Sequence, residues 1–128
     1  MERSGDVTFQ GNPLTVIGPK LKVGDKAPDF ELLANDLSAV SLADSAGKVR
    51  LLLPVPSLDT PVCDMEVRKF NEQLDALGGK AAGYVISADL PFAQARWCGA
   101  AGINAVQTLS DHRDMAFGAA YGVHIKEL

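Results

Sequence analysis

Cysteine and histidine are scarce in this sequence, with two of each among 128 residues. Two cysteines are too few for a disulfide scaffold and, without paired histidines, too few for a structural zinc site. The absence of a Cys-x-x-Cys pair disfavours a dithiol redox carrier. His112 and His124 have no second pair of ligands near them, so we expect no bound metal.

Basic clusters, long apolar runs and targeting signals are also missing. The net charge is -4, and no run of Lys or Arg is present to bind nucleic acid. No apolar stretch approaches the roughly 20 residues that span a bilayer. The first residues, MERSGDVTFQ, lack the basic-then-apolar order of a signal peptide. We therefore expect a cytoplasmic protein, with reduced thiols and without nucleic-acid or membrane partners.

Phosphate-binding loops and serine triads are absent as well. The pattern GxxxxGK[ST] does not occur, so the run of Gly78, Gly79 and Lys80 is interpreted as a helix stop. Ser57 and Ser87 have no recognisable histidine and acidic partners. We expect no cofactor.

Apolar runs bounded by turn residues predict a series of short strands. Residues 49–55 (VRLLLPV) are nearly all apolar, as expected of a central strand buried on both faces. Pro54 is placed near the end of that strand because proline cannot donate to a sheet. An N-terminal hairpin is expected to pair 7–10 with 14–17 around Gly11, Asn12 and Pro13. The other expected strands are 30–33, 40–42, 83–88 and 105–109.

Three helices are expected between and after these strands. The first holds Cys63, ends at Gly78 and Gly79, and has an apolar stripe of Val62, Met65 or Glu66, Phe70, Leu74 and Leu77. The second covers 91–98 and stops at Gly99, with Phe92 and Trp97 in the core. The third is capped by Ser110 and Asp111 and runs to about residue 122. This order predicts a single α/β domain over residues 1–128 with a mostly parallel sheet.

Residues 57–64 (SLDTPVCD) place one cysteine at the start of the first helix. Thr60 is a good N-cap residue and Pro61 is favoured at the first helical position, which puts Cys63 third. Unpaired amides and a partial positive charge in this turn favour a thiolate. We expect the Thr60 hydroxyl to bind the sulfur or a substrate oxygen, and Pro61 to shield the sulfur. The alternative is a buried structural cysteine without reactivity.

Along its whole length the sequence resembles the thiol peroxidases, the atypical two-cysteine peroxiredoxins. The resemblance is carried by VTFQGNPLTV, KVGDKAPDFEL, PSLDTPVCD, VRKFNE, ISADLPFAQARWCGA, LSDHRDMAFGAAYGV and IKEL. It implies a thioredoxin-like (peroxiredoxin) fold with an N-terminal β-hairpin. It also implies a peroxidatic Cys63 in the TPVC segment and a resolving Cys98 in the RWCGA segment. From the residues alone, a core position for Cys98 beside Trp97 is favoured over a resolving role.

The activity implied by the resemblance is thiol-dependent reduction of hydrogen peroxide and organic hydroperoxides to water or alcohols. In that family the peroxidatic cysteine becomes a sulfenic acid, here on Cys63, with Thr60 and Pro61 in the active site. An intramolecular Cys63–Cys98 disulfide then forms and is reduced by thioredoxin. The resemblance further implies a cytoplasmic homodimer.

The family's active-site arginine lies on a strand after the IKEL segment, and this chain ends at Leu128. Arg68, Arg96 and Arg113 do not match that position. We therefore expect a C-terminally incomplete domain in which the thiolate is less favoured and peroxidase activity is low. Two alternatives to an active enzyme follow. One is a catalytically weak or inactive fragment that serves in folding or pairing, and the other is a redox-sensing module.

Overall fold

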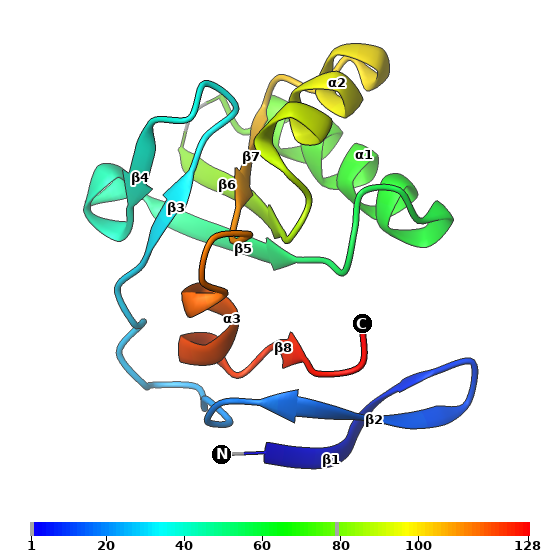
Figure 1. The fold of residues 1–128 in the computed structure, drawn as a ribbon. Coiled ribbons are helices and arrows are strands. Elements are labelled where there is room, and N and C mark those ends of the chain that lie inside the picture. The colour runs from blue at the N-terminus through cyan, green and yellow to red at the C-terminus, as the bar shows by residue number, and fades with distance from the viewer. Residues whose placement is uncertain (1, 79) are drawn as a thin grey trace.

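The computed structural model describes residues 2–78 and 80–128, which form two sheets and three α-helices (Figure 1). The five-stranded main sheet has the order β4-β3-β7-β6-β5, and the three-stranded sheet has the order β1-β2-β8. The strands are β1 Glu2–Phe9, β2 Asn12–Ile17, β3 Glu31–Leu33, β4 Ala39–Ser41, β5 Val49–Pro54, β6 Ala81–Ser87, β7 Val106–Ser110 and β8 His124–Ile125. The helices are the 3-10 turn η1 Leu42–Ser45, α1 Pro61–Ala76, α2 Pro91–Ala101 and α3 Ala116–Tyr121.

The main sheet is mixed. Strands β5, β6 and β7 are parallel, whereas β3 pairs antiparallel with both β7 and β4. The predicted central position of the strand at 49–55 is wrong, because β5 lies at the edge of the described sheet and Val49 is 74% exposed. Pro54 is the last residue of β5, as predicted, and its missing N–H suits an edge strand.

The N-terminal hairpin is present, but its turn is earlier than predicted. Gln10 and Gly11 both have positive φ, at 52° and 81°, and they alone connect β1 to β2. Asn12 and Pro13 already belong to β2. A two-residue turn with both central residues left-handed matches the twist of the paired strands and favours glycine at its second position.

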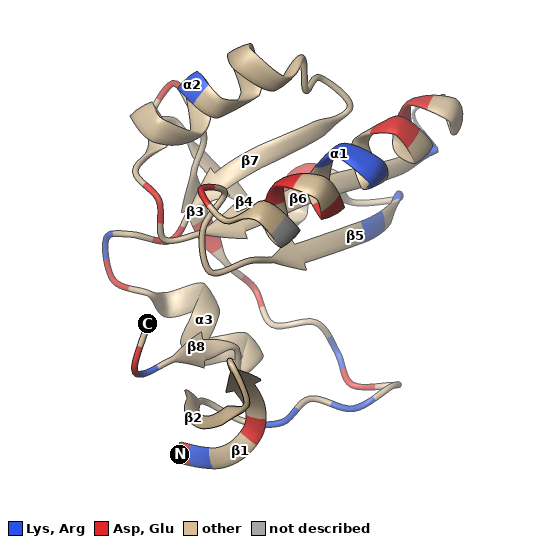
Figure 2. Cartoon of the chain, turned by 90° about the vertical axis from the view of Figure 1, so that its right-hand side faces the viewer, with Lys and Arg blue, Asp and Glu red and all other residues tan. Residues whose placement is uncertain are grey.

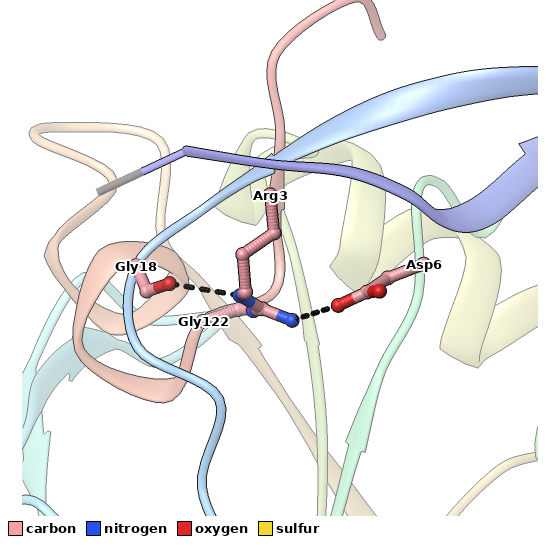
Figure 3. A network of polar contacts seen from close by, with 4 residues as sticks. All are labelled: Arg3, Asp6, Gly18 and Gly122. Atoms are coloured by element: carbon pink, nitrogen blue, oxygen red, sulfur yellow. Dashed lines mark hydrogen bonds and ion pairs between the residues drawn. The ribbon is translucent and has the colours of Figure 1, made fainter.

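Arg3 attaches this hairpin to the end of α3 (Figure 3). Its guanidinium donates to the carbonyl oxygens of Gly18 at 3.1 Å and Gly122 at 2.5 Å, and it pairs with Asp6 at 2.5 Å. Gly122 is the left-handed C-cap of α3, so the cation neutralises the negative end of that helix. At Gly18 a Cβ would lie 2.2 Å from the carbonyl oxygen of Ala119, so this close approach requires glycine.

Two apolar clusters fill the two faces of the main sheet. Along β6, Tyr84 and Ile86 point to one face, where they pack with Phe30 and with Phe117 of α3. Val85 points to the other face and packs with residues of β5, β7 and α1. Trp97 of α2 joins this second cluster, so α1 and α2 cover the same face of the sheet, as Figure 1 shows.

The core-facing side of α1 differs from the predicted stripe. Val67 and Leu74 are buried, and Cys63 and Phe70 pack against the same cluster, so these four residues form the apolar face. Met65 and Leu77, which were predicted to lie on it, are 66% and 49% exposed, and Glu66, the predicted alternative to Met65, is exposed as well. The side chain of Val62 lies outside the described part of the structure. Cys63 therefore belongs to the side of α1 that faces the sheet.

The ends of the helices agree in part with the predictions. Helix α1 ends at Ala76 and is followed by the left-handed Gly78, while Gly79 lies outside the described residues. Helix α2 does not stop at Gly99 but continues to Ala101, and the left-handed Gly102 forms its C-cap. Glycine inside a helix costs stability without ending it, whereas glycine with positive φ ends it.

Asp111 stabilises the start of α3, although α3 begins later than predicted, at Ala116. Its carboxylate accepts hydrogen bonds from the amides of Phe117 at 3.1 Å and Gly118 at 2.9 Å. Burial raises the pKa of Asp111, and these two amides partly oppose that shift. Ser110, the other predicted cap, is the last residue of β7. Within the described residues no helix has both the length and the apolar character needed to cross a membrane.

Candidate active site

The two helices that carry the cysteines begin on the same side of the main sheet, where the parallel strands β5 and β6 have their carboxyl ends. We call this side the carboxyl edge. Pro54 of β5 is in register with Ile86 of β6, and the amide of Val55 donates to the Ile86 carbonyl at 2.9 Å. The chain leaves β5 to enter α1 and leaves β6 to enter α2. Because carboxyl ends of parallel strands form the usual site of chemistry in open α/β sheets, this edge is the candidate site.

Cys63 lies in the first turn of α1, as predicted. Thr60 is the N-cap with extended dihedrals (φ −130°, ψ 140°), and Pro61 is the first helical residue. The first hydrogen bond within the helix runs from the amide of Asp64 to the Thr60 carbonyl, at 3.0 Å. The amide of Cys63 comes one residue earlier and therefore has no acceptor within the helix. The Cys63 thiol is free and half-buried against the apolar cluster beneath α1. The sulfur is thus exposed to the positive end of the helix and has limited contact with water.

The Thr60 hydroxyl does not cap α1. It donates instead to the carbonyl oxygen of Ser57 at 2.8 Å, within the loop that precedes the helix. Because that bond uses the only hydroxyl proton, the Thr60 oxygen remains able to accept a hydrogen bond. The predicted N-cap position of Thr60 is confirmed, whereas its hydrogen bond to the Ser57 carbonyl was not predicted.

Cys98 occupies the last turn of α2, where its free thiol is half-buried. Its sulfur lies 3.4 Å from the hydroxyl oxygen of Thr108 on β7. Thr108 donates its proton to the side-chain oxygen of Asn35 at 2.8 Å, so the Cys98 S–H is the donor toward Thr108. Thr108 and Asn35 were not singled out in the sequence, because they reach Cys98 only through the packing of α2 on β7.

Cys63 and Cys98 are both free thiols, so no disulfide joins them in this structure. A disulfide between them requires their Cα atoms to lie within about 7 Å of each other.

A polar contact joins the neighbours of the two cysteines. The indole N–H of Trp97 donates to the Asp64 carboxylate at 3.0 Å, and Arg68 pairs with the same carboxylate. The Arg68 guanidinium carbon also lies 5.7 Å from the centre of the Trp97 ring. The hydrogen bonds from Arg68 and then Trp97 lower the pKa of Asp64. Phe92, predicted to be a core residue, is instead 67% exposed, because Pro91 and Gln94 occupy the buried side of α2.

The comparisons with known proteins agree with this geometry. The Redoxin family model matches residues 22–128. The thiol peroxidase of Bacillus subtilis (strain 168) is 59% identical over 123 residues, which cover 96% of this chain and 73% of that protein. The chain belongs to the thiol peroxidase family. A second thiol peroxidase, from Halalkalibacterium halodurans, is 60% identical over 122 residues, covering 95% of this chain and 73% of that protein.

The fold agrees with a solved structure of the same kind. The peroxiredoxin-like protein from Aquifex aeolicus superposes with a TM-score of 0.87 at 41% identity, covering 96% of this chain and 70% of that one. The predicted thioredoxin-like α/β fold is confirmed, and so is the interpretation of the chain as a thiol-dependent peroxidase. Similarity at this level favours the enzyme over the inactive fragment. Membership of the family does not by itself assign roles to Cys63, Cys98, Thr60 and Pro61, which remain predictions.

Proposed function

We propose that Cys63 is the peroxidatic thiol, which reduces hydrogen peroxide and organic hydroperoxides. The observation that carries this proposal is the position of its half-buried sulfur in the first turn of α1, at the carboxyl edge of the parallel strands. The thiolate attacks one peroxide oxygen and the O–O bond breaks, so the sulfur is oxidised to a sulfenic acid. The other oxygen leaves with the electron pair, takes up a proton and becomes water or an alcohol.

Thr60 and Pro61 prepare this attack. The Thr60 oxygen, whose proton is held by Ser57, is free to accept a hydrogen bond from the O–H of a hydroperoxide and to orient it toward the sulfur. The ring of Pro61 fixes φ at the first helical residue and thereby the direction in which Cys63 leaves the loop. The amides of the first turn stabilise negative charge near the sulfur and on the leaving oxygen.

Cys98 is the resolving thiol in this proposal. Its sulfur attacks the Cys63 sulfenic acid, a disulfide forms, and the sulfenic oxygen leaves as water. The cap amide of Gly102 and the amide of Ile103 both donate to the Cys98 carbonyl, so Cys98 is released when the last turn of α2 opens. The exposed Gly99 in that turn weakens it. The dithiol of thioredoxin then reduces the disulfide by exchange.

Two further properties belong to the proposal. A homodimer is supported by the exposed apolar side chains at the start of α2, where Leu90 is 52% and Phe92 is 67% exposed beside the active-site edge. A cytoplasmic location is supported by the low number of cysteines, two in 128 residues, which is too few for the disulfide scaffold of a small secreted domain.

Intact mass measured after one equivalent of peroxide tests the chemistry. The chain is expected to lose the mass of two hydrogen atoms, C98S to gain one oxygen, and C63S to remain unchanged. Turnover with thioredoxin, its reductase and NADPH separates the peroxidase from a redox-sensing module, which would form the disulfide without sustained turnover. Peroxide consumption by C63S at the rate of the unmodified chain would overturn the assignment of Cys63.

A further inference from the structure

Asp89 lies in the short loop between β6 and α2, and its carboxylate accepts three hydrogen bonds. The Ser57 hydroxyl donates to Oδ1 at 2.7 Å, and the amide of Leu58 donates to Oδ2 at 2.8 Å. The third donor is the Ser87 hydroxyl, at 2.9 Å from Oδ2. Two of these donors belong to the loop that precedes α1, so a carboxylate at the start of one helix holds the loop that leads into the other.

The contacts continue from Asp89 to the N-cap of α1. The Ser57 hydroxyl, which gives its proton to Asp89, accepts from the amide of Asp59 at 3.1 Å. The Ser57 carbonyl accepts from the Thr60 hydroxyl at 2.8 Å. Asp89 therefore holds Ser57, and Ser57 in turn fixes the orientation of Thr60 at the start of the helix.

On its other side Asp89 is attached to the buried part of the sheet. Its carbonyl accepts from the Ser110 hydroxyl at 2.6 Å. Its partner Ser87 accepts from the side-chain amide of Gln94 at 2.9 Å, and Gln94 also donates to the Leu109 carbonyl at 2.9 Å. Gln94 is fully buried, and Ser87 and Ser110 are 3% and 2% exposed. Residues of β6, β7 and α2 thus form a fixed support for the carboxylate.

We infer that Asp89 is a positioning residue of the peroxidase site, which holds the loop 57–60 and the first turn of α1 in the geometry that makes Cys63 reactive. This inference rests on the function proposed above. Asp89 acts through hydrogen bonds and contacts no reacting atom. Its charge has the opposite effect, because an anion near Cys63 disfavours a thiolate.

Positioning by Asp89 would increase the reactivity of Cys63, whereas the negative charge of Asp89 would decrease it. One substitution therefore distinguishes the two effects. D89N removes the negative charge and keeps one acceptor oxygen, so at least one of the three hydrogen bonds is lost. If Asp89 acts by position, D89N lowers the reactivity of Cys63; if it acts by charge, D89N raises it. D111N is the control, because Asp111 is likewise a hydrogen-bonded carboxylate at the start of a helix: it is buried and accepts two hydrogen bonds from amides at the start of α3.

The experiment uses the C98S background, in which Cys63 is the only thiol. Alkylation of Cys63 by iodoacetamide is measured across pH, together with its stopped-flow reaction with hydrogen peroxide. We expect D89N to slow alkylation at neutral pH by about ten-fold, the effect of losing one hydrogen bond to a charged group. We also expect its pH profile to move to higher pH, while D111N leaves both measurements unchanged.

An unchanged or faster reaction of Cys63 in D89N would overturn the inference, whether or not the peroxidase function holds. If Cys63 of the C98S parent fails to react with peroxide, the proposed function fails, but the alkylation profile still decides the role of Asp89. Should D89N fail to fold, S57A removes only the 2.7 Å bond and the contact with Asp59. S57A is then expected to slow alkylation by about three-fold, and an unchanged rate would overturn the inference.

Discussion

The two cysteines lie at opposite ends of their helices. Cys63 is in the first turn of α1, at the end of the helix that carries the partial positive charge. Cys98 is in the last turn of α2, at the end of the helix that carries the partial negative charge, and its S–H donates to Thr108. Within the described residues no hydrogen-bond partner contacts the Cys63 sulfur. The two thiols thus lie at oppositely charged helix ends, and only Cys98 has a hydrogen-bonded neighbour among the described residues.

The start of α1 and the end of α2 also differ in how firmly the neighbouring chain holds them. The loop before α1 is held to Asp89 by hydrogen bonds from the Ser57 hydroxyl and the Leu58 amide. The last turn of α2 contains Gly99, at which an added Cβ would meet nothing within 4 Å. A fixed start of α1 and a weakened last turn of α2 suit the two successive steps proposed for Cys63 and Cys98. Figure 2 shows acidic residues toward both ends of α1 and basic residues between them, and Asp64 is an acidic residue in its first turn.

The largest expected effect is on the two kinetic steps when each cysteine is replaced by serine. C63S should reduce the second-order rate with peroxide to background, because no other thiolate is favoured at that edge. C98S should retain the first, rapid oxidation but lose turnover with thioredoxin. Stopped-flow kinetics and coupled NADPH oxidation measure the two steps separately. Rapid first oxidation in C63S would reverse the assignment of the two thiols.

The next effect concerns the hydroxyl at the start of α1. T60V keeps the β-branched shape but removes the oxygen that orients the hydroperoxide, so kcat/KM for peroxide is expected to fall about ten- to hundred-fold. Alkylation by iodoacetamide, which needs no such acceptor, should change much less. T60S restores the hydroxyl and is the control. Equal losses in both reactions would show that Thr60 acts only on the thiol itself.

A smaller effect is expected at the end of α2. G99A adds a methyl group in open space and strengthens the last helical turn by about 0.5–1 kcal/mol. Disulfide formation after oxidation of Cys63 should therefore slow by about two- to five-fold. A100G, a change in the opposite direction at the next exposed position, should accelerate it. Identical rates in both variants would mean that this turn need not open. Quenched-flow mass spectrometry follows the reaction.

The smallest effect concerns the contact between the helices. The pKa of Asp64 is lowered by Arg68 and Trp97, so its stabilising contribution is complete above the ordinary carboxyl value of 3.8. This contribution is lost as the pH falls through the lowered value of the folded state. The Asp64 side chain is 34% exposed, so we expect less than about 1 kcal/mol. Urea unfolding of D64N should show a weaker loss of stability in acid than the unmodified chain, and equal losses would contradict this assignment.

The start of α1 could be predicted from the sequence because its determinants are local. Thr60 and Pro61 lie next to each other and fix the position of Cys63 within one helical turn. The apolar face was harder, since Met65 and Leu77 fit a helical spacing almost as well as Val67 does. Only packing on the sheet decided between them.

Contacts between distant segments could not be predicted in this way. Asp89 and Ser57 meet because β5 and β6 are adjacent, and Thr108 reaches Cys98 because α2 packs on β7. The edge position of β5 depends on strand order, which an apolar run does not encode. The resemblance to thiol peroxidases supplied the proposed pairing of Cys63 with Cys98, but no local signal indicated the side chains that contact the two helix ends.

Competition between the two thiols for a single reagent tests the central claim most directly. The dithiol chain is treated at neutral pH with less than one equivalent of iodoacetamide, and the modified cysteine is identified by peptide mass mapping. Because Cys63 lies at the positive end of its helix and Cys98 at the negative end, the label should be found almost entirely on Cys63. Equal labelling of the two cysteines, or preferential labelling of Cys98, would contradict the account.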